Sequence, residues 1–346
     1  MTGAPTPPLP AEIAAGLAAI GIELDGAAVA EPLAGGVSSD IWHVSSGAGE
    51  WCAKRALPTL RTAQRWDAPV ERSAREADWL RAAATIAPDA VPRLIGYDDR
   101  THTLALGYLP PQRFVNWKRD LLDGRVDPSV AARLGARLRA LHDGMADGSY
   151  RRRFDRPDLI HALRLEPYLE RTAARHPDLA PRFEGLVAHF HGAARTVVHG
   201  DVSPKNVLVG DGRVVLLDAE CATWGDPWFD VAFCLTHLCA KAVHLPRRAA
   251  ALRTTAEALL DAYAAAPGAP TDDGAPWLPA LLLARVDGAS PLEYLSAAEA
   301  DTIRAVARDL LARPPSTLAG CLEGWFAMLD AGTPPQRRAV RARAPR

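Results

Sequence analysis

Val198-His-Gly-Asp-Val-Ser-Pro-Lys-Asn-Val-Leu-Val209 is the stretch that says most about the fold. It places His199, Asp201, Lys205 and Asn206 between two short β-branched runs. One interpretation is a polar turn between two strands. The other is a catalytic loop, and residues elsewhere in the chain decide between them.

A second carboxylate follows at the distance of a hairpin. Asp218 comes after the apolar residues 214–217 and twelve residues beyond Asn206, and residues 210–212 supply a turn. In phosphoryl transfer an aspartate accepts the proton of the attacking hydroxyl, and hard oxygen ligands hold the magnesium ions that bridge the phosphates. Asp201, Asn206 and Asp218 would meet both needs. The alternative is a hairpin with polar ends, which one such residue alone would not exclude.

A lysine in the middle of a predicted strand is the next candidate. Only four of the 40 basic residues are lysines: Lys54, Lys118, Lys205 and Lys241. Lys54 has apolar neighbours, so it could extend into a cleft, meet the α- and β-phosphates of a nucleotide and pair with a helix glutamate. Glu76 is the best-placed partner and Glu71 is its rival. The alternative is an outward-facing lysine on a half-exposed strand.

A glycine-rich turn precedes that lysine. Gly35, Gly36, Ser38 and Ser39 lie between two predicted strands. Glycines allow the backbone to approach phosphates closely, and serine hydroxyls can donate hydrogen bonds to them. Ordinary hairpins also contain Gly-Gly pairs, so the turn alone does not specify a nucleotide site.

Several polar residues near the loop have structural interpretations. We expect His199 to anchor the loop through ring hydrogen bonds. Asp226 suits the N-cap of a helix that has Pro227 at its first position. Asp230 lies on the apolar face of that helix, where the backbone amides of the loop would satisfy it.

Two other residues beside the loop stay open. Lys205 would contact the γ-phosphate or be solvated. Glu220 would contact the metal through water or face the substrate.

Hydrophobic periodicity and turn residues predict two lobes. The first has a helix over 11–20, strands within 29–44, 51–56, 93–97 and 103–108, and a helix from an N-cap at Asp67 to about Ala84. The second has helices opening at Asp127 and covering 159–175, 183–193, 226–242, 247–265, 276–285, 297–313 and 315–330, with β segments at 196–209 and 213–218. This order predicts an α+β fold with an N-lobe over 1–107, a C-lobe over 108–346 and a ligand cleft at their junction. Residues 1–10 are expected to be disordered, and the last ten to be a solvated tail.

Composition excludes some classes of protein. The net charge is −1 and 48% of residues are hydrophobic, which gives no reason to expect nucleic acid or a membrane as partner. The first residues lack a signal-peptide pattern, and no apolar run is long enough to span a bilayer. Five cysteines without CxxC spacing suit a cytoplasmic protein with reduced thiols.

Other candidates have little support. Asp98, Asp99 and His102 lie on a predicted hairpin turn and lack the spacing of metal ligands. Ser203 lacks the G-x-S-x-G setting of a nucleophilic serine. Trp224 and Trp228 would either stack on a sugar or quaternary amine or belong to the core. Residues 285–294 form an irregular polar stretch that is a candidate lining of a substrate pocket.

Taken together, three motifs resemble the aminoglycoside phosphotransferase and choline kinase-like superfamily of small-molecule kinases, which have a protein-kinase-like fold. These motifs are His199-Gly-Asp-Val-Ser-Pro-Lys-Asn-Val-Leu208, Leu217-Asp-Ala-Glu220 and Gly225-Asp-Pro-Trp-Phe-Asp-Val-Ala232. Upstream, Leu33-Ala-Gly-Gly-Val-Ser-Ser39 is similar to the nucleotide loop of the family. Lys54, Glu76 and Val91-Pro-Arg-Leu-Ile-Gly-Tyr97 follow in the family's order.

The resemblance implies a role for each matched position. Asp201 would be the catalytic base and Asn206 and Asp218 the magnesium ligands. Lys54 would bind the α- and β-phosphates, with Glu76 orienting it. The turn that contains Gly35, Gly36, Ser38 and Ser39 would cover the phosphates, and a hinge of Gly107, Tyr108 and Leu109 would hold adenine. The implied cofactors are Mg²⁺ and ATP, with GTP as the alternative nucleotide.

The expected activity is therefore an ATP- and magnesium-dependent phosphotransferase that acts on a hydroxyl of a small molecule, such as a sugar, an amino alcohol or an aminoglycoside-like compound. The protein would be a monomer or a homodimer. A non-catalytic nucleotide-binding regulatory module would require a broken catalytic set, and no member is missing. A protein kinase is disfavoured because only seven residues separate Asp218 from Asp226, which leaves no room for an activation loop. Residues 231–346 show no acidic excess for a polycation.

Overall fold

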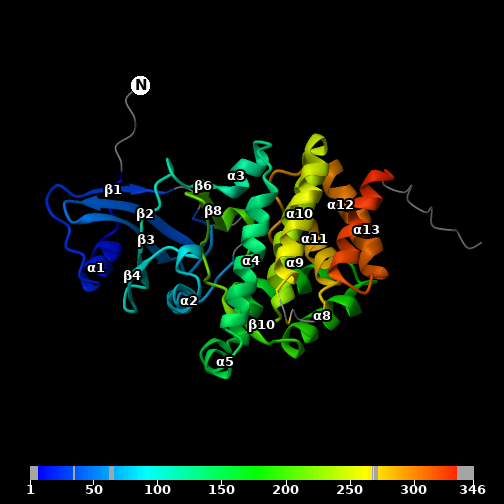
Figure 1. Ribbon diagram of the computed structural model, residues 1–346. Coiled ribbons are helices and arrows are strands. Elements are labelled where there is room, and N and C mark those ends of the chain that lie inside the picture. The colour runs from blue at the N-terminus through cyan, green and yellow to red at the C-terminus, as the bar shows by residue number, and fades with distance from the viewer. Residues whose placement is uncertain (1–6, 34–35, 62–65, 267, 269–271, 333–346) are drawn as a thin grey trace, which may run out of the picture.

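The computed structural model describes residues 7–33, 36–61, 66–266, 268 and 272–332. Figure 1 shows a sheet together with two helices at the left of the molecule. A mostly helical half lies at the right. The predicted α+β, two-lobed architecture is therefore confirmed. The division at residue 107 stays a prediction, because packed side chains continue from one lobe into the other.

A five-stranded antiparallel sheet forms the N-terminal lobe, in the order β1-β2-β3-β5-β4. Its strands are β1 (Val29–Pro32), β2 (Ser39–Ser46), β3 (Gly49–Ala56), β4 (Leu94–Asp98) and β5 (Thr103–Gly107). Successive side chains of a strand point to opposite faces. Ala53 and Ala105 pack with α1 (Ala11–Ala19), whereas Leu104 and Leu106 belong to the core that contains α2 (Arg72–Ile86). Lys54 lies opposite Leu104 in the register, so its side chain is on the α2 face.

The start of α2 differs from the prediction. Asp67 is not its N-cap, because Thr59 Oγ1 donates to Asp67 Oδ1 at 2.7 Å and the two residues form an isolated β-bridge. The helix begins at Arg72 after Glu71, whose side chain makes no capping hydrogen bond. Asp67 therefore lies too far before the first helical residue to cap α2.

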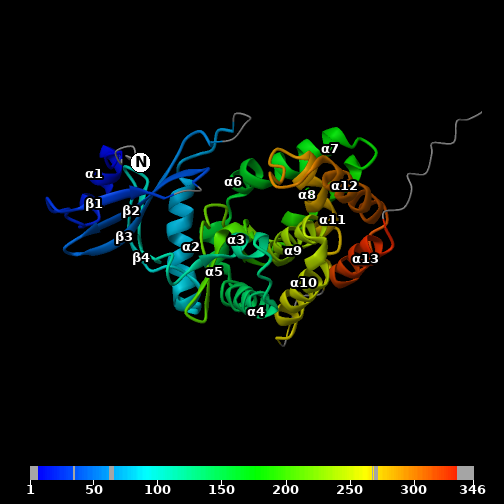
Figure 2. The same cartoon turned by 90° about the horizontal axis from the view of Figure 1, so that it is seen from above.

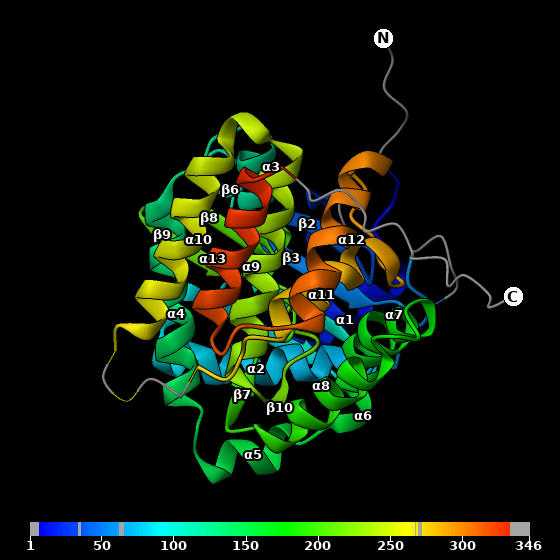
Figure 3. The same ribbon diagram turned by 90° about the vertical axis from the view of Figure 1, so that its right-hand side faces the viewer.

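Helices make up most of the C-terminal lobe. They are α3 (Trp117–Leu122), α4 (Pro128–Gly144), α5 (Gly148–Phe154), α6 (Pro157–Ile160), η2 (His161–Glu170), α7 (Arg171–Arg175), α8 (Ala180–Gly192), α9 (Pro227–His244), α10 (Ala249–Ala264), α11 (Trp277–Asp287), α12 (Ala297–Ala312) and α13 (Leu318–Asp330). Three short 3₁₀ turns are η1 (Pro88–Ala90), η3 (Pro204–Asn206) and η4 (Pro246–Arg248). Figure 3 looks onto α9, α10 and α13, which contact one another.

Most of these helices match the predicted ranges. Asp127 caps α4 as expected, since its carboxylate accepts from Ser129 N at 2.9 Å. The sequence did not predict α3 and α5, which have six and seven residues and too few turns for a clear periodicity. The predicted helix 159–175 contains the π-helical segment η2 with Pro167 inside it. A wider helix accommodates a residue that lacks a backbone N–H.

Two small sheets flank residues 199–206, the predicted catalytic loop. β6 (Val115–Asn116), β8 (Val207–Gly210) and β9 (Arg213–Leu216) form one, and β7 (Thr196–Val198) pairs with β10 (Thr223–Gly225) in the other. The predicted hairpin is confirmed, because Val207 lies opposite Leu216. β9 ends at Leu216, so Asp218 follows the strand rather than ending it. The sequence did not predict β6 and β10, which have two and three residues.

Helix α2 connects the two lobes. Figure 2 shows it between the sheet and α4, both of which it contacts. Its Trp79 meets the ring of His199 edge-on, with the ring centroids 5.0 Å apart. No helix within the described ranges is long and apolar enough to cross a membrane.

Candidate active site

A pocket of about 840 Å³ lies where the sheet faces the C-terminal lobe. Ten of the residues predicted from the sequence line it: Gly36, Ser38, Lys54, Glu76, Gly107, Tyr108, Leu109, Asp201, Asn206 and Asp218. Ser39 does not line it, because its side chain is buried at the start of β2. Gly35 lies outside the described residues. The sequence therefore identified one continuous surface from residues far apart in the chain.

Asp230 and His199 hold the catalytic loop in place. The Asp230 carboxylate, on α9, accepts from His199 N at 2.6 Å and from Gly200 N at 2.8 Å. His199 Nε2 donates to Leu217 O at 3.0 Å, and its Nδ1 accepts from Asp201 N at 3.2 Å. Burial lowers the pKa of His199, so the neutral ring supplies one donor and one acceptor. Both residues have the structural contacts expected from the sequence.

Asp201 is a buried but ionised carboxylate. Its Oδ2 lies 2.8 Å from Arg164 Nη2 and 3.2 Å from Lys205 Nζ. Burial alone would raise the pKa of Asp201, but the charges of Lys205 and Arg164 reverse this and lower it. Only the ionised form can accept a proton, so the surroundings of Asp201 keep it competent as a base.

Asn206 and Asp218 are brought together by the hairpin. Leu217 N donates to Asn206 O at 2.9 Å, which fixes Asp218 next to Asn206 in the backbone ladder. Asn206 Nδ2 donates to Asp201 O at 3.0 Å. Among the described residues no donor reaches Asn206 Oδ1, which leaves that oxygen for another partner. Asp218 has a φ of 66°, a left-handed conformation that costs energy for a residue with a side chain and is typical of functional sites.

This pair of oxygen ligands fits a magnesium ion. Mg²⁺ in phosphoryl-transfer sites is held by one or two protein oxygens together with substrate phosphates and water. No cluster of three or more His, Cys, Asp or Glu side chains with metal-binding geometry is found in the described ranges. Two protein oxygens are a donor set of the kind that holds an ion bound together with nucleotide phosphates.

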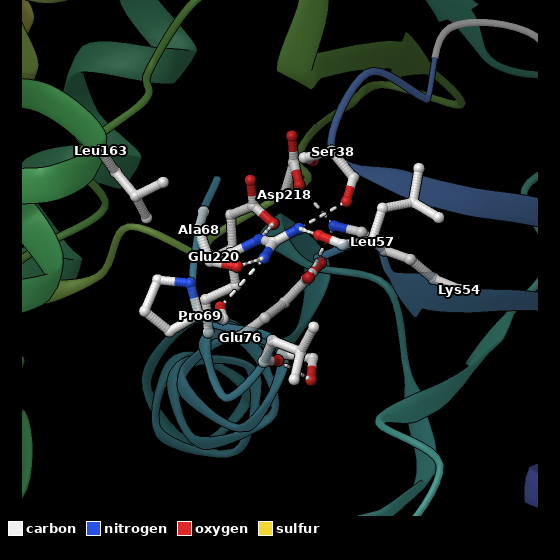
Figure 4. Close-up of polar contacts among 12 residues, drawn as sticks. Ser38, Lys54, Leu57, Ala68, Pro69, Glu76, Leu163, Asp218 and Glu220 are labelled. Carbon is white, nitrogen blue, oxygen red and sulfur yellow. Dashed lines mark hydrogen bonds and ion pairs between the residues drawn. The ribbon is translucent and has the colours of Figure 1, made fainter. Parts of the chain in front are cut away.

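Lys54 lies between two carboxylates. Its Nζ is 2.6 Å from Glu76 Oε2 and also donates to Asp218 Oδ1, as Figure 4 shows. Burial alone would lower the pKa of Lys54, but Asp218 and Glu76 raise it, so the ammonium stays charged. Burial raises the pKa of Glu76 to about 7, whereas the charge of Lys54 lowers the pKa of Asp218. Glu76, and not the rival Glu71, is therefore the partner of Lys54.

Gly36 requires the absence of a side chain. A Cβ atom there would lie 2.1 Å from Ser39 O. The backbone at Gly36 therefore packs tightly against Ser39, and Gly36 and Ser38 line the same pocket as Lys54.

Arg72 connects Ser38 to the segment that contains Asp218 and Glu220. The fully buried guanidinium donates from Nε to Glu220 Oε2 at 2.9 Å, and from Nη2 to Ser38 O at 2.6 Å and Leu57 O at 2.7 Å. Its Nη1 donates to the carbonyls of Ala68 and Pro69. Figure 4 shows these acceptors gathered around one centre. Glu220 pairs with Arg72 and also lines the pocket, so both of its predicted alternatives stay predictions.

Two arginines of the site were not predicted. Arg164 lies on η2, with Nε donating to Gly200 O at 2.8 Å, and Arg72 opens α2. All but four of the 40 basic residues are arginines, so neither stands out in the sequence. The only signal was that each falls on the inner side of a predicted helix.

The remaining candidates separate clearly. Trp228 is core, since 1% of it is exposed and it packs on Tyr263. Trp224 is half-buried and does not line the pocket. Of the stretch 285–294, Arg285, Ser290, Pro291, Leu292 and Glu293 line the pocket, as the sequence suggested.

Comparison with known proteins gives a consistent result. Residues 29–270 match the model of the phosphotransferase enzyme family. Over 239 residues the chain is 26% identical to methylthioribose kinase of Erwinia tasmaniensis. The matched region covers 60% of this chain and 59% of that protein. The chain thus spans less than two thirds of the length of this curated relative.

Solved structures show the same fold. An amicoumacin kinase in complex with AMP-PNP, Ca²⁺ and Ami superposes with a TM-score of 0.52 at 16% identity, over 83% of this chain and 89% of that one. A putative aminoglycoside phosphotransferase from Ralstonia eutropha gives a TM-score of 0.50 at 13% identity, over 89% and 94%. At these identities the likeness concerns the fold alone.

Proposed function

Because the chain belongs to the phosphotransferase enzyme family, we propose that it transfers the γ-phosphoryl group of ATP to a hydroxyl of a small molecule, with Mg²⁺ as cofactor. One observation carries the proposal. A single pocket holds an ionised buried aspartate, a pair of oxygen ligands and a charged buried lysine: Asp201, Asn206, Asp218 and Lys54.

Asp201 is the proposed base. It accepts the proton of the acceptor hydroxyl while the hydroxyl oxygen forms a bond to the γ-phosphorus. The bond between the γ-phosphorus and the β–γ bridging oxygen breaks, and ADP leaves with that oxygen. Phosphoryl transfer depends on positioning and charge neutralisation. Arg164 and Lys205 keep Asp201 ionised, and the bonds from Asp230 to the loop amides fix its position.

Asn206 and Asp218 would hold Mg²⁺, which when bound neutralises the charge of the phosphates. Lys54 would bind the α- and β-phosphates, and Glu76 would keep its ammonium directed into the pocket. Gly36 and Ser38 would cover the phosphates, and Gly107, Tyr108 and Leu109 would hold adenine at the connection between the lobes.

Two features favour a small-molecule acceptor over a protein. β10 pairs with β7, so the segment between Asp218 and Asp226 is tied into a sheet and offers no activation loop. On the acceptor side, α3 and residues 290–293 line a pocket of about 840 Å³, a size that suits a small molecule.

The five cysteines, all within the described ranges, are unpaired, which suits the reducing cytoplasm in which we place the enzyme.

Asp201→Asn tests the assignment. We expect turnover to fall by about 10³-fold, within the range for loss of a general base, while the dissociation constant for ATP changes less than about twofold. ADP release is measured over a panel of sugars, amino alcohols, hydroxy acids, nucleosides and aminoglycosides. Asp211→Asn, at the tip of the β8–β9 hairpin, is the matched control. Near-normal turnover of the Asp201 variant would contradict the proposal.

A further inference from the structure

The acceptor end of the pocket is lined by the C-terminal lobe. Lys118 and Arg119 come from α3, His237 from α9, Arg285 from α11, and Ser290 to Glu293 from the segment that follows. The nucleotide end, marked by Lys54 and Gly36, is instead lined by the N-terminal sheet. The chemistry of the acceptor is therefore to be read from the C-terminal group.

Arg285 is a buried cation without an acidic partner. Only 9% of the residue is exposed. Its Nη1 donates to Tyr168 OH at 3.1 Å and to Ser290 Oγ at 2.9 Å, and both are neutral groups. Its Nε has no acceptor, and Nη2 makes no hydrogen bond with a described residue. An unpaired guanidinium away from water is costly, so an anion that binds there would be favoured.

Arg285 is also close to the reacting groups. Its guanidinium carbon lies 5.6 Å from the centroid of the Tyr168 ring, and that of Arg164 lies 5.6 Å from the same ring. Arg164 in turn pairs with Asp201. A compact acceptor could thus reach both Asp201 and Arg285.

Lys241 is a second buried basic residue, and it lies behind the residues that line the acceptor end of the pocket. It is fully buried on α9, with Nζ 4.9 Å from the Tyr294 ring centroid and 3.5 Å from Tyr294 OH. Burial, with Lys118 and Arg285 nearby, lowers the pKa of Lys241 to about 7. Burial and the same cations lower the pKa of His237 well below its usual value. Burial is the largest cause of both pKa shifts, and the neighbouring cations add to it.

The acidic groups nearby are already matched. Asp201 pairs with Arg164 and Lys205, and Glu293 pairs with Lys118. Arg285 remains as excess positive charge, and Lys241 adds to it in its protonated form. All four lysines of this arginine-rich chain thus lie in or directly behind this one pocket.

We propose that the phosphate acceptor carries an anionic group, a carboxylate or a phosphate, and that Arg285 binds it through Nη2 while the hydroxyl lies at Asp201. This proposal rests on the kinase function proposed above and specifies its substrate class. A polycationic acceptor such as an aminoglycoside, or a quaternary amine, meets a site of the wrong sign. The planar guanidinium suits both anions, since each offers it two oxygens.

The test compares matched compounds. ADP release by the full chain is measured with glycerate against glycerol, gluconate against glucose, glucose 6-phosphate against glucose, and with choline and an aminoglycoside. We expect the preferred acceptor to be anionic, with kcat/KM at least tenfold above that of its neutral counterpart. The carboxylate and phosphate arms show which anion is used. Arg285→Gln should raise KM for that acceptor at least tenfold and leave KM for ATP unchanged, and Arg285→Lys should recover part of the loss.

A binding measurement keeps the test decisive if no compound in the panel is phosphorylated. With Mg²⁺ and ADP saturating, citrate and inorganic phosphate should raise the Tm of the wild type and of Arg313→Gln, an exposed control outside the pocket. They should not raise it for Arg285→Gln. Absence of this Arg285-dependent shift, or equal turnover of neutral or cationic acceptors, would overturn the proposal. Asp201→Asn separates the two hypotheses, since it should abolish turnover and leave the anion-dependent shift in place.

Discussion

Arg72 Nε donates to Glu220 Oε2 at 2.9 Å across 148 residues of sequence, from a guanidinium with no exposed surface. The same group donates to Ser38 O at the mouth of the nucleotide end of the pocket. One side chain therefore ties the predicted phosphate turn to the segment that contains Asp218.

Arg72→Met should destabilise the protein by about 3 kcal/mol, because it leaves a buried Glu220 carboxylate unpaired and removes the donors of four carbonyls. Arg72→Lys keeps the charge but offers fewer donors in a different geometry, so we expect an intermediate loss of stability. In that variant KM for ATP should rise more than kcat falls, since Ser38 loses its anchor. Urea unfolding and steady-state kinetics measure these effects.

Arg81→Lys is the control for Arg72, because its side chain is half-exposed and pairs with Asp78 on the same helix. Arg81→Lys should leave both the stability of the protein and KM for ATP unchanged. If Arg72→Lys lowers stability without changing KM for ATP, the residue has a structural role only and does not position the nucleotide turn.

The sequence predicted the site best where function requires a fixed spacing. Asp201 and Asn206 share one loop, and Asp218 follows at hairpin distance, so local rules sufficed to place them. Lys54 could be matched to Glu76 because strand alternation and the helix that follows limit the choice. Arg72 and Arg164 escaped prediction as site residues because their partners are decided by tertiary packing.

A glycine in the catalytic loop provides a second prediction. Gly200 has a φ of 78°, and a Cβ atom there would lie 2.8 Å from Cys221 Cβ and Cys221 O. Its N–H donates to Asp230, and its carbonyl accepts from Arg164. Gly200→Ala should therefore cost about 3 kcal/mol, from left-handed strain and displacement of a packed neighbour together. It should also lower kcat, since Asp201 is the next residue.

Gly212→Ala separates the two contributions. Gly212 has a φ of 70° but no atom within 4 Å of its Cβ position. Only the backbone strain remains, so we expect a loss of about 1 kcal/mol and unchanged kcat. Thermal unfolding and kinetics of both variants give the comparison. Equal losses at the two positions would show that crowding by Cys221 is not a cost.

Helix boundaries show where local rules fail. Asp67 and Pro69 form a good helix-start pattern, yet Thr59 occupies the Asp67 carboxylate and α2 begins at Arg72. A contact outside the local window therefore decides where α2 begins. By contrast, the predicted helix over 159–175 does continue through Pro167, there in π-helical form as η2.

The pH dependence of stability tests the buried lysine of the acceptor end. The pKa of Lys241 is about 7 in the folded protein, below its ordinary value of 10.5. Between these two values the unfolded chain binds more protons at this group than the folded one, so the group makes stability rise as pH rises from about 7 to about 10.5. The groups that act on it are Lys118 on α3, Arg285 on α11, Cys234 on its own helix, and Glu293.

Lys241→Met removes this penalty and keeps an unbranched apolar side chain against Tyr294. The variant should be more stable than the wild type at pH 7, by on the order of 4 kcal/mol, because the pKa of Lys241 falls from 10.5 to about 7 and each unit corresponds to about 1.4 kcal/mol. The difference should shrink as the pH is raised to about 10, and urea unfolding of both proteins at several pH values measures it. The same variant should lose affinity for an anionic acceptor, which would explain why a destabilising lysine is kept at this position. A stability difference that does not change with pH would show that Lys241 titrates normally and that the acceptor end is less positive than its side chains imply.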